Sequence, residues 1–312
     1  MKILLEPIKK LKHSEFLSVK DEGGIAYKFS AKEVLDLHKI KISRSVEFDE
    51  SLKVLHYPWQ IFQLNDWAIR QDFELITARR KSKPISKSNK VINPSQIFIE
   101  PGASVEHCIL NASTGPIYIG KNATIQEGSM IRGPFALCEG SLVKMGSKIY
   151  GATTIGPYCL AGGEIKNSIL FGYSNKAHDG YLGDSVIGEW CNLGAGTSNS
   201  NLKNNCGDVN YWVHADKKEM SAGNKGGLLM GDYSKAAINT SFNTGTVVGI
   251  CSNVFAQGLT PKYIPHFSWG ADGITRYKLS NAINDIDKWK QLKGFSITEK
   301  EKQILTDICK KF

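Results

Sequence analysis

The sequence lacks both an export signal and a membrane span. Its first ten residues, MKILLEPIKK, do not contain the apolar core of a signal peptide, and no apolar run approaches the length of a transmembrane helix. These absences predict a soluble, cytoplasmic protein. Of the 312 residues, 41% are hydrophobic and 22% are charged, which is ordinary for a globular chain of one large domain or two medium ones.

Paired cysteines are also missing. The seven cysteines include no C-x-x-C pair, and their number is odd. A disulfide framework or a structural zinc site is therefore not expected, and the composition suits a reducing compartment. We expect no metal cofactor.

No RNA- or DNA-binding motif accompanies the net charge of +9. Much of this charge lies in one stretch, which contains Arg79, Arg80, Lys81, Lys83, Lys87 and Lys90. A basic surface can attract nucleic acid, membranes or anions such as sugar phosphates and coenzyme A. Because Pro84 and several serines interrupt the stretch, residues 79–94 are interpreted as a solvated basic linker. Neither nucleic acid nor a membrane is expected as a partner.

What the sequence has instead is a repeat of six residues between positions 95 and 260. Apolar residues recur at this spacing in eight consecutive positions, and the residue two positions earlier is usually small. The period then slips by two residues, resumes at Ile187 and Leu193, and appears a third time. The first run is Ile119, Ile125, Ile131, Leu137, Val143, Ile149, Ile155 and Ala161, and the last is Met230, Ala236, Phe242, Val248 and Val254.

A period of six fits neither an α-helix, which repeats near 3.6, nor a single strand, which repeats near 2. It predicts short strands joined by tight turns, three to a coil, each with one residue pointing inward. The expected fold is mainly β: a left-handed parallel β-helix over residues 95–270. Glycines such as Gly120 and Gly188 directly follow inward positions, where we expect backbone conformations closed to other residues. An irregular β-sandwich with chance spacing is the alternative.

The segments around the repeat have other patterns. Residues 1–78 are interpreted as a partial α/β domain, with helical spacing around Ala31–His38 and Trp59–Ile69. The aromatic segment Tyr57–Phe62 is expected to be buried. Residues 203–228 break the period and should project as a loop from a corner of the coil.

The chain after residue 270 is expected to form C-terminal helices over 271–312. Ser280–Leu292 and Thr298–Phe312 have amphipathic spacing, and Ser296 or Thr298 is a plausible cap for the second helix. We expect these helices to pack near the end of the coil.

One histidine stands where the period is disturbed. His178 lies in the segment Ser174–Asp184, and imidazole titrates near neutrality, so it can act as a general base. The competing interpretation is a buried, hydrogen-bonded structural histidine. Stacked coils have no deep pocket of their own. Ligands are therefore expected in clefts between the prisms of a homotrimer, with catalytic residues at a corner or an adjacent face.

The sequence around His178 resembles the acetyltransferase half of the bifunctional N-acetylglucosamine-1-phosphate uridylyltransferase/glucosamine-1-phosphate acetyltransferase family. The resemblance runs without a gap from Lys166 to Asn201 and extends more weakly back to Lys148. Its segments are Glu164-Ile165-Lys166, Ala177-His178-Asp179-Gly180-Tyr181-Leu182-Gly183-Asp184, Asn192-Leu193-Gly194-Ala195-Gly196-Thr197 and Ser200-Asn201.

This resemblance implies an enzyme that transfers an acetyl group from acetyl-CoA to an amino-sugar phosphate in nucleotide-sugar biosynthesis. His178 would remove a proton from the acceptor amine, and Glu164 would hold and polarise His178. The implied substrate ligands are Lys148, Lys166, Tyr181 and Asn192. The implied acetyl-CoA contacts are Ala195, Asn201 and Ala256, and a backbone N–H near Ala195 would stabilise the oxyanion.

The sequence departs from the family pattern at several positions. Lys148 replaces an arginine and keeps its charge, but it loses the bidentate fork for phosphate. Ile238 aligns with a serine that lies near the thioester, and Lys203 is close to a family lysine without aligning with it. The family's C-terminal arginine for the coenzyme has no clear counterpart. These departures bear on the prediction of the acyl donor more than on the prediction of the sugar phosphate.

Longer segments resemble sugar nucleotidyltransferases fused to a hexapeptide coil, namely Gly133–Leu137, Phe242–Gly249, Phe267–Gly270 and Tyr57–Phe73. This resemblance implies that residues 1–78 are the end of a nucleotidyltransferase domain. Residues 1–30 lack the glycine-rich loop that nucleotidyl transfer requires, since only Gly23-Gly24 stand there. In an alternative function, the coil would be a trimerising or regulatory module of such a protein. A third hypothesis is a zinc hydratase, but His107, His178 and His214 have unsuitable spacing.

Overall fold

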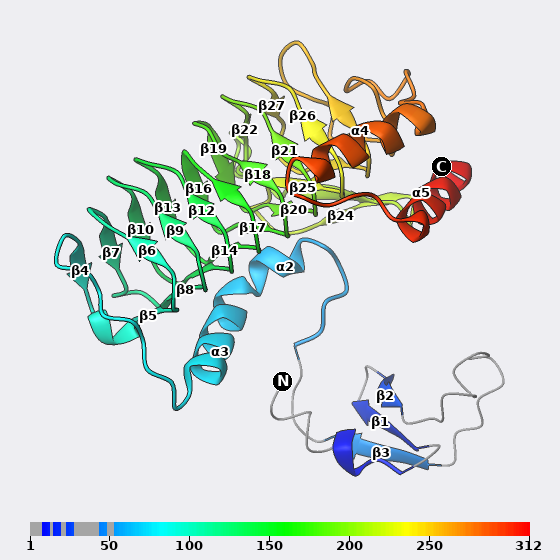
Figure 1. Cartoon of the computed structure of the whole chain (residues 1–312). Coiled ribbons are helices and arrows are strands. Elements are labelled where there is room, and N and C mark those ends of the chain that lie inside the picture. Colours follow the sequence, from blue (N-terminus) through cyan, green and yellow to red (C-terminus); the bar gives the residue numbers. More distant parts are fainter. Residues whose placement is uncertain (1–7, 13–14, 20–22, 28–43, 49–52) are drawn as a thin grey trace. The chain divides into compact units, whose positions relative to one another are not determined.

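The computed structural model describes the chain except for residues 1–7, 13–14, 20–22, 28–43 and 49–52 (Figure 1). The chain forms two compact units, Met1–His56 and Tyr57–Phe312. In the first unit, β1 (Glu15–Val19) pairs antiparallel with β2 (Gly23–Tyr27) and parallel with β3 (Arg44–Phe48). The helix expected around Ala31–His38 falls outside the described residues.

The second unit is built around a coil of parallel strands with three faces (Figure 1). Each strand pairs with the strand directly above it in the next coil, so one face collects every third strand. The predicted left-handed parallel β-helix is confirmed. Its period of six arises because each face supplies one short strand with one inward side chain.

We number the faces in chain order. Face 1 contains β4 (Lys90–Ile92), β7 (Ile109–Asn111), β10 (Met130–Arg132), β13 (Lys148–Tyr150), β16 (Glu164–Lys166) and β19 (Tyr181–Gly183). Face 2 contains β5 (Ile97–Ile99), β8 (Ile117–Ile119), β11 (Phe135–Leu137), β14 (Thr153–Ile155), β17 (Ile169–Leu170), β20 (Val186–Ile187), β25 (Leu228–Met230), β28 (Thr246–Val248) and β30 (Tyr263–Ile264). Face 3 contains β6 (Ser104–Val105), β9 (Thr124–Ile125), β12 (Leu142–Val143), β15 (Leu160–Ala161), β18 (Asn175–Lys176), β21 (Asn192–Leu193), β26 (Lys235–Ala236) and β29 (Asn253–Val254). Two further strands, β22 (Ser198–Asn199) and β27 (Ser241–Phe242), pair with each other, and a 3₁₀ turn, η2, spans Pro94–Gln96.

The inward side chains of the three faces form one continuous core. Every apolar position of the three six-residue runs belongs to it, and none is more than 4% exposed. The small residues that stand before these positions are buried as well. Among them, the hydroxyl of Ser141 donates to the Gly156 carbonyl at 2.6 Å, which satisfies a polar group inside the turn region.

Glycine is required directly after the inward positions because the backbone of the next coil lies too close for a side chain. The prediction that an unusual backbone conformation requires glycine there is wrong. Their φ angles are outside the left-handed region. A Cβ at Gly156 would lie 2.5 Å from the Leu170 carbonyl oxygen, and one at Gly188 would lie 2.8 Å from the Asp232 backbone nitrogen. The next coil therefore leaves no room for a side chain there.

We expect Gly156→Ala to lower the free energy of unfolding by about 3 kcal/mol or more, because the clashing atom belongs to the backbone. Gly146→Ala is the matched control. Gly146 has φ +69°, and a Cβ added there would meet nothing within 4 Å, so only the conformational penalty of about 1–2 kcal/mol applies. Urea unfolding of both variants measures the difference. If Gly146→Ala lost more unfolding free energy than Gly156→Ala, the backbone conformation of a glycine would matter more than the space around it.

Three short spacings between inward residues produce the slip in the period: four residues from Ala161 to Ile165, and five each from Ile165 to Leu170 and from Leu182 to Ile187. Only Gly162 and Gly163 connect β15 to β16, whereas four residues, Ala177–Gly180, connect β18 to β19 one coil later. We call the turns that lead from face 3 to face 1 the 3–1 corner. The short turn lies directly against the four-residue turn that carries His178, since a Cβ at Gly162 would be 2.3 Å from the Ala177 carbonyl oxygen.

Two helices before the coil lie on face 2, namely α2 (Gln60–Gln63) and α3 (Asn65–Thr77) (Figure 1). The Asn65 side-chain amide donates to the Ala152 carbonyl at 2.7 Å. Trp59 and Phe62 are buried, and Trp59 stacks on Tyr211 with ring centroids 5.3 Å apart. The prediction of helix around Trp59–Ile69 is confirmed, and the predicted burial of the aromatic segment holds for Trp59 and Phe62, whereas Tyr57 is half-buried.

The basic segment before the coil contacts its first turn. The Lys83 N–H donates to the Ile99 carbonyl at 2.8 Å, and the Ile99 N–H donates to the Ser82 hydroxyl at 2.9 Å. The Asn89 side chain accepts from the Cys108 N–H and donates to the Val105 carbonyl. These contacts satisfy backbone groups at the edge of the first coil. The proposed division of the chain at residues 78, 94 and 270 stays a prediction.

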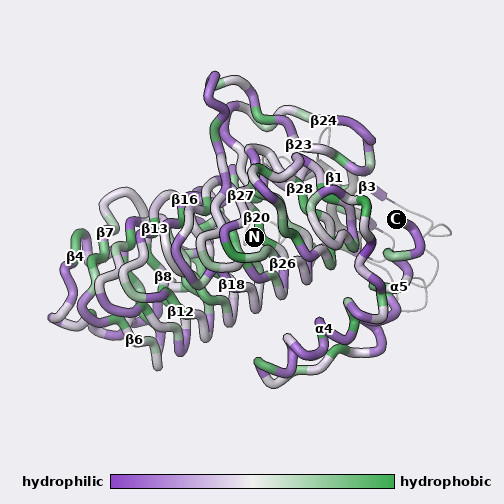
Figure 2. Tube along the Cα trace, turned by 90° about the horizontal axis from the view of Figure 1, so that it is seen from above, coloured by the Kyte–Doolittle hydropathy of each residue, from purple (hydrophilic) through white to green (hydrophobic). Residues whose placement is uncertain are grey.

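The break over residues 203–228 contains an antiparallel hairpin, formed by β23 (Asn210–Val213) and β24 (Lys218–Ser221). It projects from the coil (Figure 2). Its Tyr211 side chain is fully buried against Trp59, and the Gln63 side chain donates to the Ala222 carbonyl at 2.8 Å. The hairpin is therefore fastened to the helical segment beside it.

The C-terminal helices are α4 (Leu279–Gln291) and α5 (Glu299–Lys311), and they pack beside the last coils as predicted (Figure 1). Thr298 caps α5 through a capping box with Glu301. Phe295 lies edge-on against Tyr173 and Trp190 at the side of the coil. None of the helices in the described part of the chain has the length and hydrophobicity needed to cross a bilayer.

Glu301 joins these helices to the coil. Its carboxylate accepts hydrogen bonds from Lys290, from the Thr298 N–H at 2.7 Å and from the Tyr233 hydroxyl at 2.9 Å. Burial alone would raise its pKa, but the hydrogen bonds from Lys290, Thr298 and Tyr233 outweigh burial and lower the pKa to about 2.

We expect Glu301→Gln to be less stable than the natural chain at neutral pH. Because the folded pKa is below the ordinary value of 4.5, the carboxylate contributes fully above about pH 4.5 and loses its contribution as the pH falls toward 2. The difference in unfolding free energy should shrink over that range, as measured by urea unfolding. Glu299→Gln, at an exposed carboxylate of the same helix, is the control. A difference that stays constant with pH would contradict the linkage.

Candidate functional site

Four predicted site residues lie on adjacent strands of face 1. Lys148 is on β13, Glu164 and Lys166 are on β16, and Tyr181 is on β19. Lys148 pairs with Glu164, and Glu164 pairs with Tyr181, so these three residues form one column across the coils. Neighbouring strands are about 4.8 Å apart, and the column therefore places an ammonium, a carboxylate and a phenol in succession.

Tyr150 holds the Glu164 carboxylate. Its hydroxyl donates to Glu164 Oε1 at 2.6 Å, and this hydrogen bond, aided by burial, raises the pKa of Tyr150 to about 12. Sequence reasoning missed Tyr150. It was detectable, since Tyr150 stands two residues after Lys148 and residues i and i+2 of a strand share a face.

A second network fixes Tyr181. The Asn201 side-chain amide donates to the Tyr181 hydroxyl at 3.1 Å and also to the Asp184 carboxylate. Asn167 donates to the other oxygen of Asp184 at 2.7 Å. Burial, reinforced by the Asp184 charge, raises the pKa of Tyr181, so its hydroxyl is neutral near pH 7. Sequence reasoning assigned roles to Tyr181 and Asn201 and missed the two residues that orient them.

His178 is exposed at the 3–1 corner, in the turn between β18 and β19. Its ring is not packed inside the prism, and the ring forms no hydrogen bond with any described residue. The next turn of the corner touches this one, because the Gly196 N–H donates to the Asp179 carbonyl at 3.0 Å. Contact between Glu164 and His178 stays a prediction, since the hydrogen-bond partner of Glu164 here is Tyr150.

Ala195 lies in that next turn. Its carbonyl accepts from the Asn239 N–H at 2.7 Å, and the N–H groups of Gly194, Gly196 and Thr197 all donate to backbone carbonyls. Within the described residues nothing accepts the Ala195 N–H. The stabilisation of an oxyanion by this amide stays a prediction.

Ala256 is exposed further along the same corner. It borders a cavity of about 470 Å³ together with Phe255 and Trp269, whose rings meet edge to face with centroids 5.8 Å apart. The cavity offers mostly apolar and aromatic surface. Ile238 is 69% exposed. It lies at the 3–1 corner after β26, between the turn of Ala195 after β21 and the turn of Ala256 after β29.

Asn192 does not join this group within one chain. It is on β21 of face 3, where it accepts from the Asn175 side chain at 3.5 Å and pairs in register with Lys235. A role for Asn192 at the same ligand would need a second subunit, and this role stays a prediction.

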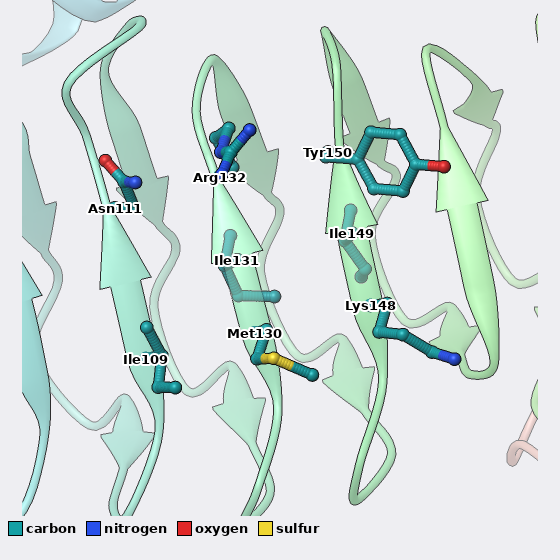
Figure 3. Close-up of a pocket in the computed structure, with 8 residues that line it drawn as sticks. All are labelled: Ile109, Asn111, Met130, Ile131, Arg132, Lys148, Ile149 and Tyr150. Carbon is teal, nitrogen blue, oxygen red and sulfur yellow. The ribbon is translucent and has the colours of Figure 1, made fainter.

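A shallow groove of about 390 Å³ runs across β7, β10 and β13 on face 1 (Figure 3). Ile109 and Met130 form its apolar side, and Asn111, Arg132 and Tyr150 form the polar side. Lys148 lies at its edge, next to the Glu164 strand. Arg132, Lys148 and Lys166 form no ion pair with any described residue, and Glu164 is the one carboxylate beside them, so this part of face 1 has a net positive charge. Sequence reasoning missed Arg132.

The histidines of the coil region are not assembled into a metal site in the described chain. His107 and His178 are in different turns, and His214 is in the projecting hairpin beside His266. Among the described residues, no group of three or more histidine, cysteine, aspartate or glutamate side chains could hold a metal ion.

Comparisons with known proteins find sugar nucleotidyltransferases and bifunctional nucleotidyltransferase/acetyltransferases. The profile of a family described as sugar nucleotidyl transferase matches residues 2–81. The bifunctional protein GlmU of Methanocaldococcus jannaschii is 38% identical over 86 residues, which are 28% of this chain and 21% of that protein.

A bifunctional sugar-1-phosphate nucleotidylyltransferase/acetyltransferase of Sulfurisphaera tokodaii is 25% identical over 251 residues, which are 77% of this chain and 53% of that protein. The chain thus spans about half, or less, of the length of these relatives. They confirm the resemblance to bifunctional nucleotidyltransferase/acetyltransferases. Among solved structures, the polySia specific acetyltransferase NeuO aligns with a TM-score of 0.31 and 14% identity, over 62% of this chain and 88% of that chain. That likeness is too distant to bear on function.

Proposed function

We propose that the chain transfers an acetyl group from acetyl-CoA to the amine of an amino-sugar phosphate. The observation that carries this proposal is the exposed His178 in the turn that leads into face 1, whose strands carry Arg132, Lys148 and Lys166. Imidazole can accept a proton, and the cations can hold a phosphate dianion. The names of the relatives support a transferase of this class.

In the proposed reaction, the substrate amine attacks the thioester carbonyl carbon. His178 accepts the proton that the amine loses, and the Ala195 N–H stabilises the oxyanion of the tetrahedral intermediate. The carbon–sulfur bond then breaks, and the departing thiolate takes up a proton from the imidazolium. The products are the amide and the free thiol of coenzyme A, and the imidazole returns to its neutral form.

Lys148 and Lys166 are proposed to bind the phosphate of the substrate, with Arg132 as a third cation. Tyr181, Asn192 and Glu164 would position the sugar and the imidazole. Acetyl-CoA would lie along the 3–1 corner past Asn201, Ala195 and Ala256. A homotrimer would close these open surfaces into clefts, with Asn192 supplied by a neighbouring subunit.

The test is the acetylation of glucosamine 1-phosphate by acetyl-CoA, measured through the release of the free thiol of coenzyme A. Glucosamine without phosphate is the control, and we expect it to react far more slowly because it cannot engage the cations of face 1. Acetylation of both compounds at equal rates would contradict the phosphate assignment. No thiol release with any hexosamine 1-phosphate would refute the proposed function.

A second candidate function is supported by the family match over residues 2–81. In this alternative, those residues are the end of a nucleotidyltransferase domain, and the coil is its trimerising or regulatory module. Release of pyrophosphate from UTP and a sugar 1-phosphate, without any acetyl transfer, would favour this function over the first.

A further inference from the structure

Lys176 occupies an inward position of face 3, where the coil otherwise has apolar side chains. It pairs in register with Ala161 and is only 1% exposed. The other inward residues of this face are Val105, Ile125, Val143, Ala161, Leu193, Ala236 and Val254. A lysine inside this column therefore needs a specific explanation.

The ammonium of Lys176 reaches the 3–1 corner from inside the prism. It donates to the Gly162 carbonyl at 3.2 Å and to the His178 carbonyl. Burial lowers the pKa of Lys176 to about 8. The one side chain thus joins two successive turns, the short turn at Gly162 and the turn that carries the exposed imidazole.

The two turns are pressed together at this point. A Cβ at Gly162 would lie 2.3 Å from the Ala177 carbonyl oxygen, and one at Gly163 would lie 2.8 Å from the His178 carbonyl oxygen. Peptide oxygens crowded at a corner need donors, because a buried carbonyl without a hydrogen bond is costly. Any apolar residue at position 176 would leave both oxygens without this donor.

We propose that Lys176 is a positioning residue that fixes the backbone of the His178 turn by donating to its carbonyl from within the coil. The side chain does not touch the substrate, and it acts through the backbone of residue 178. Its effect on catalysis rests on the proposed function, whereas its effect on the imidazole does not.

The test compares Lys176→Met, which fills the volume without a donor, with Val143→Ala, a change two coils away in the same inward column. Two readouts are needed. The first is the NMR signal of the His178 ring, identified by its loss in His178→Ala. The second is kcat for the acetylation of glucosamine 1-phosphate, together with KM for acetyl-CoA.

We expect Lys176→Met to shift or broaden the His178 signal and to lower kcat by about 10²-fold, with KM for acetyl-CoA changed less than threefold. Val143→Ala should lower the melting temperature without either effect. If Lys176→Met does not fold, Lys176→Gln replaces it, since the shorter amide does not reach both carbonyls and the same changes are expected.

The outcomes separate this proposal from the proposed function. An unchanged His178 signal together with kcat within twofold of the natural chain would overturn the role of Lys176 and leave the transferase intact. A natural chain that lacks acetyl transfer would refute the transferase. In that case a His178 signal perturbed in Lys176→Met but not in Val143→Ala would still support the positioning role.

Discussion

Replacement of His178 by alanine should lower kcat for the acetylation of glucosamine 1-phosphate by about 10²–10⁴-fold, the usual contribution of a general base. KM for acetyl-CoA should change little, because the coenzyme is proposed to contact Asn201, Ala195 and Ala256. The side chain is exposed and forms no hydrogen bond with the described residues, so its removal should leave the melting temperature unchanged.

His214→Ala is the matched control, since His214 is also exposed but belongs to the projecting hairpin. It should retain the kcat of the natural chain. Thiol release measured at saturating acetyl-CoA gives kcat, and thermal unfolding verifies that both variants are folded. If His178→Ala acetylates at the natural rate, His178 is not the base, whatever the remaining activity of the chain.

The largest expected effect on stability is that of Phe135→Ala. Phe135 is fully buried on β11 of face 2, paired with Ile117 below and Thr153 above. Truncating a buried phenylalanine typically costs about 3–5 kcal/mol of unfolding free energy. The upper part of that range applies here, because strands on both sides hold the backbone in register and prevent the cavity from collapsing.

Phe171→Ala serves as the control, because Phe171 is 41% exposed. Its loss should cost less than about 1 kcal/mol in a monomer, and urea unfolding measures both variants. A small loss for Phe135→Ala would mean that the coil can close the cavity by shifting its strands. The fold would then be more deformable than its hydrogen-bonded register indicates.

The architecture was predictable because a period of six leaves a direct trace in the sequence. Ile119, Leu137 and Ile155 are inward residues of face 2 in three successive coils, and each was identified by spacing alone. The capping residue Thr298 was predictable for a similar reason, since a threonine followed by Glu301 is a local signal. Local patterns require no knowledge of the rest of the chain.

Contacts between coils were less accessible from the sequence. Tyr150 and Glu164 are 14 residues apart, and only the strand register reveals that they meet. The clash that requires glycine at 188 depends on residue 232, on the far side of the hairpin insertion. Spacing identified these glycines, but it could not distinguish a crowded position from a strained one.

Part of the candidate site was predicted through motif resemblance, and the structure supplies the neighbours of those residues. Lys148, Glu164 and Tyr181 form one column, as a shared ligand would require. The periodic pattern could not identify Lys176, because the period was disturbed at that point. The disturbance includes the short Gly162-Gly163 turn, which packs directly against the His178 turn.

The contacts of residues 82–89 with the first coil have a consequence for polymerisation. An open solenoid ends in a row of free peptide groups, on which another molecule can add its own rung and start a fibre. Ser82, Lys83 and Asn89 already occupy such groups on Ile99, Val105 and Cys108. This stretch therefore blocks end-to-end growth, and deleting it should expose a surface on which fibres can start.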